Sequence, residues 1–349
     1  RLACAHGPRR WAAEALDLCQ PQPQLQLQPQ LKQRRRSHPM GDFFTISVLV
    51  ATLASGIRLA TPFLLAGLGE TIGQRSGVLN LGVEGVMLLG AFSAYYVTLE
   101  SGSAVYGILG AIVVGLVMGL IYAFVTLIMH AEQGISGIGV YLFGLGFTDL
   151  LFQKNVGTPK PIRGLGEVNI PLLSDIPKVG EILFQHSVPV YFAFALVPLV
   201  WFMINKTTFG LNIRAVGETP EAADTLGVSV NMTRLATMLI GSTMASLAGA
   251  ALALEVGIFQ QNLTSGQGFI AIALVYFGAW RSYGVMLGAL LFGIVQATVL
   301  QLKTLGIVEG ANSSLMAMAP AVLTIVVLVI VSRRVAAPGA LTRPFDRSA

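Results

Sequence analysis

Charge is scarce in this chain, and cysteine is almost absent. Charged residues make up 11% of the 349 residues, hydrophobic residues make up 54%, and the mean hydropathy is +0.71. A soluble globular domain carries roughly 25% charged residues, so this composition excludes an ordinary soluble protein and places the chain in a bilayer. Both cysteines, Cys4 and Cys19, lie near the N-terminus. Neither disulfides nor thiolate metal sites are therefore available in the apolar part.

The excess of positive charge is confined to the N-terminal segment. Residues 1–39 hold seven Lys and Arg against two Asp and Glu, which accounts for the net charge of +5, while residues 40–349 hold fifteen of each. The basic character is therefore no evidence for a nucleic-acid partner.

Motifs for nucleotide and metal chemistry are absent from the sequence. The chain has no GxxxxGK[ST] loop and no HExxH motif, and its four histidines are scattered. It therefore has no P-loop for ATP and no predicted metal site. No acid–base constellation marks catalytic residues, so we expect a protein that is not an enzyme and that has no cofactor.

Residues 1–39 differ in kind from the rest of the chain. Their middle is the low-complexity tract QPQPQLQLQPQLKQ, and Met40 directly precedes the first apolar run. Such a tract cannot bury an apolar surface. We expect residues 1–39 to be a disordered leader foreign to the working protein, and residues 40–349 to be the transmembrane domain. The alternative is a disordered cytoplasmic tail.

Nine segments are apolar enough to form transmembrane helices, which need about 20 residues each. We therefore predict an all-α polytopic membrane protein with about nine transmembrane helices, within a range of about eight to ten, some of them broken or re-entrant. The segment beginning at Phe269 is too short to cross the bilayer alone. The predicted segments are Phe44–Leu68, Val83–Leu99, Val105–Met129, Ile135–Phe152, Val188–Ile204, Leu235–Gly257, Phe269–Trp280, Gly284–Leu302 and Leu315–Val331.

The distribution of Lys and Arg favours one orientation. With residues 205–234 in the cytoplasm, nine basic residues lie inside and five outside, in agreement with the positive-inside rule. This places the C-terminus in the cytoplasm and residues 153–187 in an external loop. Nine spans would then put the basic leader outside, which indicates either that the leader is absent from the working protein or that the count is off by one.

Two polar, glycine-rich breaks interrupt the apolar pattern, at Glu70–Glu84 and at Gln260–Gly268. Irregular backbone at membrane depth is tolerated where it is buried in protein or lines a cavity. The alternative for the first break is a plain cytoplasmic connection. We predict that polar side chains in and near these breaks line the substrate pathway, although they could also be merely structural. The candidates are Gln74, Asn80, Glu84, Glu255, Gln260, Gln261 and Gln296.

A long polar segment, Lys206–Val230, lies between two apolar runs, where short links are usual. Thr219, Pro220 and Glu221 are typical of a helix start, and Gly227 is a natural stop. We predict a short helix on the membrane surface that contacts a soluble partner. An ordinary surface helix is the alternative.

The pattern Glu221-Ala222-Ala223 with Gly227 resembles the EAA-type coupling loop of ATP-binding-cassette importer permeases, in which a short helix docks into the ATPase subunit. The resemblance extends to RLATPFLLAG from Arg58, SGVLNLGVEGVM from Ser76, IPLLSDIP from Ile170, GQGFIAIA from Gly266 and APGALTRPF from Ala337. Together these motifs resemble the branched-chain amino acid/ribose-type permease family, and within it the smaller nucleoside or simple-sugar permease. The ATPase-coupling residues implied by this resemblance are Arg214, Gly217, Glu218, Pro220, Glu221, Ala222, Ala223, Asp224 and Gly227.

The resemblance implies a complete importer around this chain. Such permeases work in the bacterial plasma (inner) membrane with a cytoplasmic ABC ATPase, a homologous second permease subunit and an extracytoplasmic substrate-binding lipoprotein. The implied substrate is a nucleoside, with a simple sugar as the alternative. A self-contained secondary transporter is the rival from another class, because it would need no ATPase.

Overall fold

Helices account for most of the described chain. The computed structural model describes residues 45–169, 179–306, 315–316, 318–331 and 336–345. Residues 1–48 and 49–349 form two separate units, and the predicted leader lies outside the described residues. The helices are α4 (Ile46–Arg75), α5 (Val83–Ser101), α6 (Ala104–Ala123) continued by the π-helix Phe124–Ile128, α7 (Gln133–Asn155), α8 (Val179–Leu183), α9 (Val188–Lys206), α10 (Thr208–Glu218), α11 (Pro220–Thr225), α12 (Val230–Val256), α13 (Gln267–Phe277), α14 (Ser282–Thr304) and α16 (Ala319–Val331).

The prediction of an all-α membrane protein is confirmed. Among the described residues, six helices are long and apolar enough to cross a membrane: α4, α6 with its π-helical end, α7, α9, α12 and α14. The apolar helices α13 and α16 are shorter. Each of the nine predicted segments overlaps a helix, and a total of nine crossings stays a prediction.

The helix α12 packs against α5 and α6 through small residues. A Cβ atom at Gly249 would collide with the carbonyl oxygen of Met87, and one at Gly90 would collide with Ser246. The Ser246 hydroxyl donates a hydrogen bond of 2.6 Å to the carbonyl of Ala111. The backbones of these three helices therefore approach closely, as small residues allow in membrane helices.

The irregular break after α4 is shorter than the predicted Glu70–Glu84. The helix α4 continues to Arg75, and only residues 76–82 lie outside helices, with Gly77 at φ +87°. The Tyr122 hydroxyl donates to the carbonyl of Leu79 (2.6 Å), and the Leu79 N–H donates to the Gln133 side chain (2.9 Å). The break is thus fastened to the neighbouring helices.

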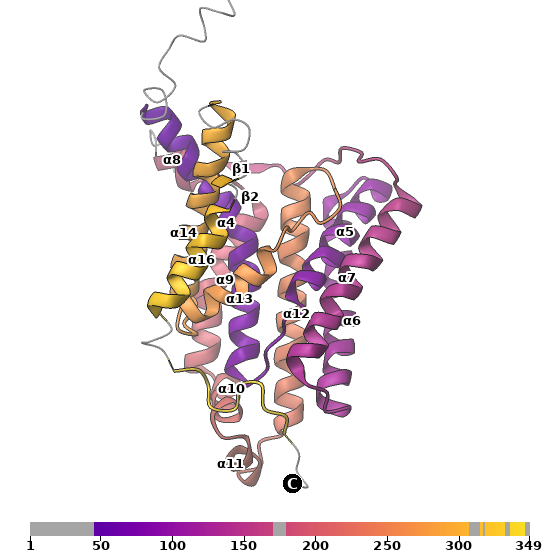
Figure 1. The fold of residues 1–349 in the computed structure, drawn as a ribbon, viewed down its shortest axis with the longest axis vertical. Coiled ribbons are helices and arrows are strands. Elements are labelled where there is room, and N and C mark those ends of the chain that lie inside the picture. The colour runs from indigo at the N-terminus through magenta and orange to yellow at the C-terminus, as the bar shows by residue number, and fades with distance from the viewer. Residues whose placement is uncertain (1–44, 170–178, 307–314, 317, 332–335, 346–349) are drawn as a thin grey trace, which may run out of the picture. The chain divides into compact units, whose positions relative to one another are not determined.

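The two ends of the helical unit 49–349 are built differently (Figure 1). At one end, β1 (Glu167–Asn169) pairs antiparallel with β2 (Gln185–Ser187), with α8 before β2. At the other end lie α10 and α11. Residues 170–178 of the predicted external loop lie outside the described residues.

Glu132 caps α7 by accepting hydrogen bonds from the N–H groups of Ile135 and Gly134, and these hydrogen bonds lower the pKa of the Glu132 carboxyl.

Candidate coupling and gating sites

The polar segment between α9 and α12 is almost entirely helical. It contains α10 and α11, and α12 begins at Val230 rather than at the predicted Leu235. The Thr207 hydroxyl accepts the N–H of Gly210 at 3.1 Å and so caps α10. The expectation of a single short helix was therefore incomplete, because α10 is an amphipathic helix without an apolar run long enough to mark it.

The predicted short helix exists as α11, with Pro220 in its first turn and Gly227 at φ +88° beyond its end. Thr219 precedes it, but the Thr219 side chain makes no capping hydrogen bond. Ala223 is buried against an apolar cluster with Val216, Val230 and Phe345. One face of α11 is therefore anchored to the body of the protein.

The opposite face of α11 is open. Glu221, Ala222 and Thr225 are exposed, and Leu226 at the tip is 85% exposed. An apolar side chain of that exposure gains nothing from folding alone. Leu226 was not among the predicted coupling residues, because exposure cannot be recognised from one Leu in a sequence.

The C-terminal residues 336–345, here called the strap, connect α10 to the break after α4. The Ala340 N–H donates to the carbonyl of Gly217 (2.9 Å), and the Thr342 N–H donates to the carbonyl of Gly77 (3.1 Å). A Cβ atom at Gly217 would collide with the Arg75 carbonyl oxygen. The end of α10 is therefore in backbone contact with the end of α4.

Arg234, from within α12, contacts both the break after α4 and the strap. Its side chain is 1% exposed, its Nε donates to the Ser76 carbonyl (3.3 Å) and its Nη1 donates to the Arg343 carbonyl (3.0 Å). Arg234 therefore fastens α12 to the break after α4 and to the strap.

Two of the predicted pathway residues, Gln74 and Asn80, are buried and engaged in hydrogen bonds. Gln74 donates to Glu70 through Nε2 (3.0 Å) and accepts from the Trp280 indole through Oε1 (2.9 Å). The Asn80 side chain accepts the N–H of Gly82 at 2.9 Å. Gln74 therefore ties α4 to the turn after α13, while Asn80 shapes the break itself.

Glu84 joins the two predicted breaks. Its carboxylate accepts hydrogen bonds from the Thr264 hydroxyl (2.5 Å), the Gly266 N–H (2.7 Å) and the Gly268 N–H (2.6 Å). The side chain is 1% exposed. A carboxylate at the start of α13 complements the positive end of that helix and its unpaired N–H groups. Glu84 thus fixes where α13 begins.

The remaining predicted pathway residues lie apart from this network. Gln260 and Gln261 are exposed in the second break, and the exposed Glu255 accepts a hydrogen bond from Ser187 at 2.9 Å. Gln296 is half-buried on α14, with its Oε1 atom buried and without a hydrogen-bond partner. Within the described ranges, no cluster of three His, Cys, Asp or Glu side chains could hold a metal ion.

Comparison with known proteins identifies the family. Residues 52–331 match the family described as the branched-chain amino acid transport system permease component. The chain is 38% identical over 275 residues to the putative glucose ABC transporter permease protein TsgC13 of Haloferax volcanii. This alignment covers 77% of this chain and 83% of that protein. It is 34% identical over 314 residues to the guanosine ABC transporter permease protein NupQ of Bacillus subtilis, an alignment that covers 86% of this chain and 98% of NupQ. It is 33% identical over 309 residues to the nucleoside ABC transporter permease protein NupC of Lactococcus lactis, an alignment that covers 85% of this chain and 96% of NupC. No solved structure matches the chain. The chain therefore belongs to the family of branched-chain amino acid transport system permease components, as its motifs predict.

Proposed function

We propose that this chain is the permease subunit of an ATP-driven nucleoside importer and that α10 and α11 form its ATPase docking site. The observation that carries this proposal is the tip of α11, where Glu221 and Leu226 are exposed while Ala223 is anchored against Val216 and Val230. A partner that covers Leu226 removes an apolar side chain from water and gains binding energy from it.

The contacts of α10 give a route for movement. A push on α11 moves α10, whose Gly217 touches the end of α4 and the strap. Arg234 then carries the displacement to α12 and to the break after α4. Alternating access works by such rigid-body movement of helices between two arrangements.

A nucleoside is the cargo that the sequence relatives favour. Two of the three relatives above are named for guanosine or nucleosides, and they cover more of this chain than the glucose relative does. A nucleoside is uncharged, and Gln296, Gln260 and Gln261 offer neutral hydrogen-bonding groups. Gln74, Asn80 and Glu84 act beside this path by holding the broken helices in place. A simple sugar is the second candidate because of the glucose relative.

The complex and its orientation complete the proposal. The distribution of Lys and Arg favours an orientation with α10, α11 and the C-terminus in the bacterial cytoplasm, where the ABC ATPase lies, and nine crossings then put residue 40 on the other side. Residues 153–187, with the paired strands β1 and β2, face the other side and receive the substrate-binding lipoprotein. A homologous second permease pairs with residues 40–349, and residues 1–39 have no part in transport.

The test is uptake by proteoliposomes that contain the complete complex. We expect guanosine uptake to require internal ATP and the binding protein, and to survive an uncoupler. Glucose in place of guanosine tests the second cargo. Uptake by this chain alone, driven by a pH gradient, would contradict the proposal in favour of a secondary transporter.

A further inference from the structure

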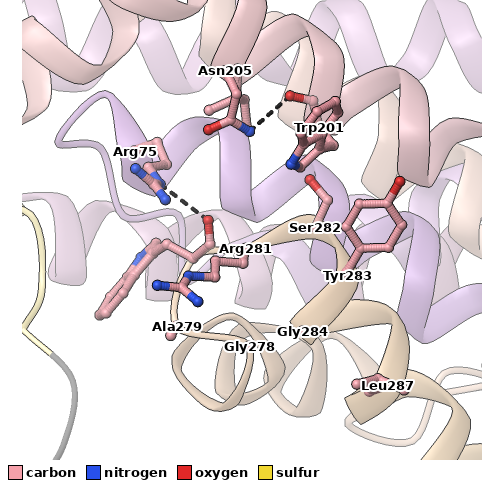
Figure 2. A pocket seen from close by; sticks show the side chains of 12 residues that line it. Arg75, Trp201, Asn205, Gly278, Ala279, Arg281, Ser282, Tyr283, Gly284 and Leu287 are labelled. Atoms are coloured by element: carbon pink, nitrogen blue, oxygen red, sulfur yellow. Dashed lines mark hydrogen bonds between the residues drawn. The ribbon is translucent and has the colours of Figure 1, made fainter.

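A cavity of about 730 Å³ lies between the end of α9 and the turn that joins α13 to α14 (Figure 2). Arg75 from the end of α4, Trp201 and Asn205 from α9, and residues 278–284 line it. Neither α10 nor α11 contributes to its lining. The cavity is therefore a feature separate from the proposed ATPase docking site.

Positive charge dominates this cavity. Arg75 and Arg281 line it, and no Asp or Glu is among its lining residues. Arg214 and Arg281 both act electrostatically on Arg75, and Glu218 is the carboxylate that opposes them. Glu218 also accepts a hydrogen bond from the strap at Gly339 (3.2 Å). Two guanidinium groups, Arg75 and Arg281, therefore line the cavity with no carboxylate beside them in the lining, and this favours an anion.

The guanidinium of Arg75 is held in place at the cavity wall. Its Nε donates to the Trp280 carbonyl at 3.1 Å, and Trp280 is itself held by Gln74 through its indole N–H. A guanidinium has five N–H donors in a planar fork that matches the oxygens of a phosphate. One hydrogen bond to a carbonyl therefore leaves donors for a ligand.

Aromatic side chains form the other side of the cavity. Figure 2 shows Arg75 and Arg281 on one side and Trp201 and Tyr283 on the other. The Trp201 and Tyr283 rings lie with their centroids 6.3 Å apart, and the Lys206 ammonium is 6.0 Å from the Trp201 ring centroid. Leu287, also in the lining, is 61% exposed. Aromatic rings beside basic residues are typical of the membrane–water interface.

We infer that this cavity is a binding site for a phosphate-bearing anion. Arg75 and Arg281 hold the phosphate oxygens by charge-assisted hydrogen bonds, and Trp201 and Tyr283 cover the less polar part of the molecule. Two sources supply this chemistry, the headgroup of an anionic phospholipid and a soluble phosphate monoester. The site does not depend on the identity of the transported substrate.

The lipid source is tested by retention of lipid. The full chain is placed in nanodiscs of phosphatidylcholine with or without phosphatidylglycerol, extracted in a neutral detergent, and examined by native mass spectrometry. We expect phosphatidylglycerol to stay bound to the wild type and to be retained at least tenfold less by Arg75→Gln and Arg281→Gln. Arg163→Gln, an exposed arginine outside the cavity, is the matched control.

The soluble source is tested in detergent by tryptophan fluorescence with inorganic phosphate and glycerol 3-phosphate as probes. Two of the three tryptophans, Trp201 and Trp280, line the cavity, and Trp11→Phe removes the third signal. A saturable change that Arg281→Gln weakens at least tenfold and Arg281→Lys weakens less supports the soluble source. Unsaturable responses to both probes overturn the site when the wild type retains no phosphatidylglycerol, or when wild type and variants retain it equally. The wild-type arms decide this even where an arginine variant fails to fold.

Discussion

At the residue scale, Glu84 carries a structural task that its sequence context does not reveal. A carboxylate next to a glycine-rich break predicts a polar pathway, but the partners of Glu84 lie in the second break, about 180 residues further along the chain. Both breaks were recognised from glycine and polar residues. Their contact was not predictable, because one sequence gives no information on which distant donors meet a buried acceptor.

The role of Glu84 gives a prediction for stability. Glu84→Gln replaces one accepting oxygen by an N–H₂ donor that faces N–H or O–H donors, and an unsatisfied buried polar group costs about 1–3 kcal/mol. We expect a lower thermal unfolding midpoint in detergent than for the wild type. Glu100→Gln, exposed at the other end of α5, is the control. Equal midpoints for the two variants would show that the Glu84 hydrogen bonds are unimportant.

Gly217 is a second residue with a structural role, and its role is steric. Gly217→Ala forces α10 away from the Arg75 carbonyl, and overpacking of this kind costs about 1–3 kcal/mol. We expect reduced thermal stability and reduced guanosine uptake. Gly146→Ala in α7, where an added Cβ has no neighbour within 4 Å, is the matched control. The control should be neutral or stabilising by up to about 1 kcal/mol, and similar losses in both variants would refute the contact.

At the scale of elements, hydropathy predicts the long apolar helices and misses a short amphipathic helix. The nine apolar segments each overlap a helix, and α11 was predicted from its Pro220 and Gly227 signals. The helix α10 and the strap were missed. Their positions depend on backbone contacts with Gly217 and Gly77, which leave no periodic pattern in the sequence.

The strap can be tested by truncation. A chain that ends at residue 335 leaves the buried Arg234 without the Arg343 carbonyl and the Gly217 and Gly77 carbonyls without their donors. We expect a lower unfolding midpoint and at least tenfold lower uptake, since each lost buried hydrogen bond costs about 1–3 kcal/mol. A chain that ends at Phe345 keeps every described strap contact and should behave like the wild type. Full uptake without the strap would show that it has no part in coupling.

At the scale of the whole molecule, the proposed docking tip of α11 is linked to a buried network. The tip is Leu226 and Glu221, and the network is Gly217, Arg234 and the break after α4. Glu221→Lys reverses a charge on the exposed face of α11 and changes the net charge of the docking surface, so loss of uptake in that variant has more than one explanation. Leu226 offers a cleaner test because its side chain is 85% exposed in this chain.

The most direct test of coupling is ATP hydrolysis by the complete complex in proteoliposomes, measured together with guanosine uptake. Leu226→Ser should leave the unfolding midpoint of the chain unchanged, while ATPase binding weakens at least tenfold and substrate-stimulated hydrolysis and uptake fall together. Val105→Ser changes another exposed apolar side chain, 60% exposed at the start of α6, and should keep both activities. Normal coupling in Leu226→Ser, or an equal loss in Val105→Ser, would contradict the assignment of α11 as the ATPase docking element.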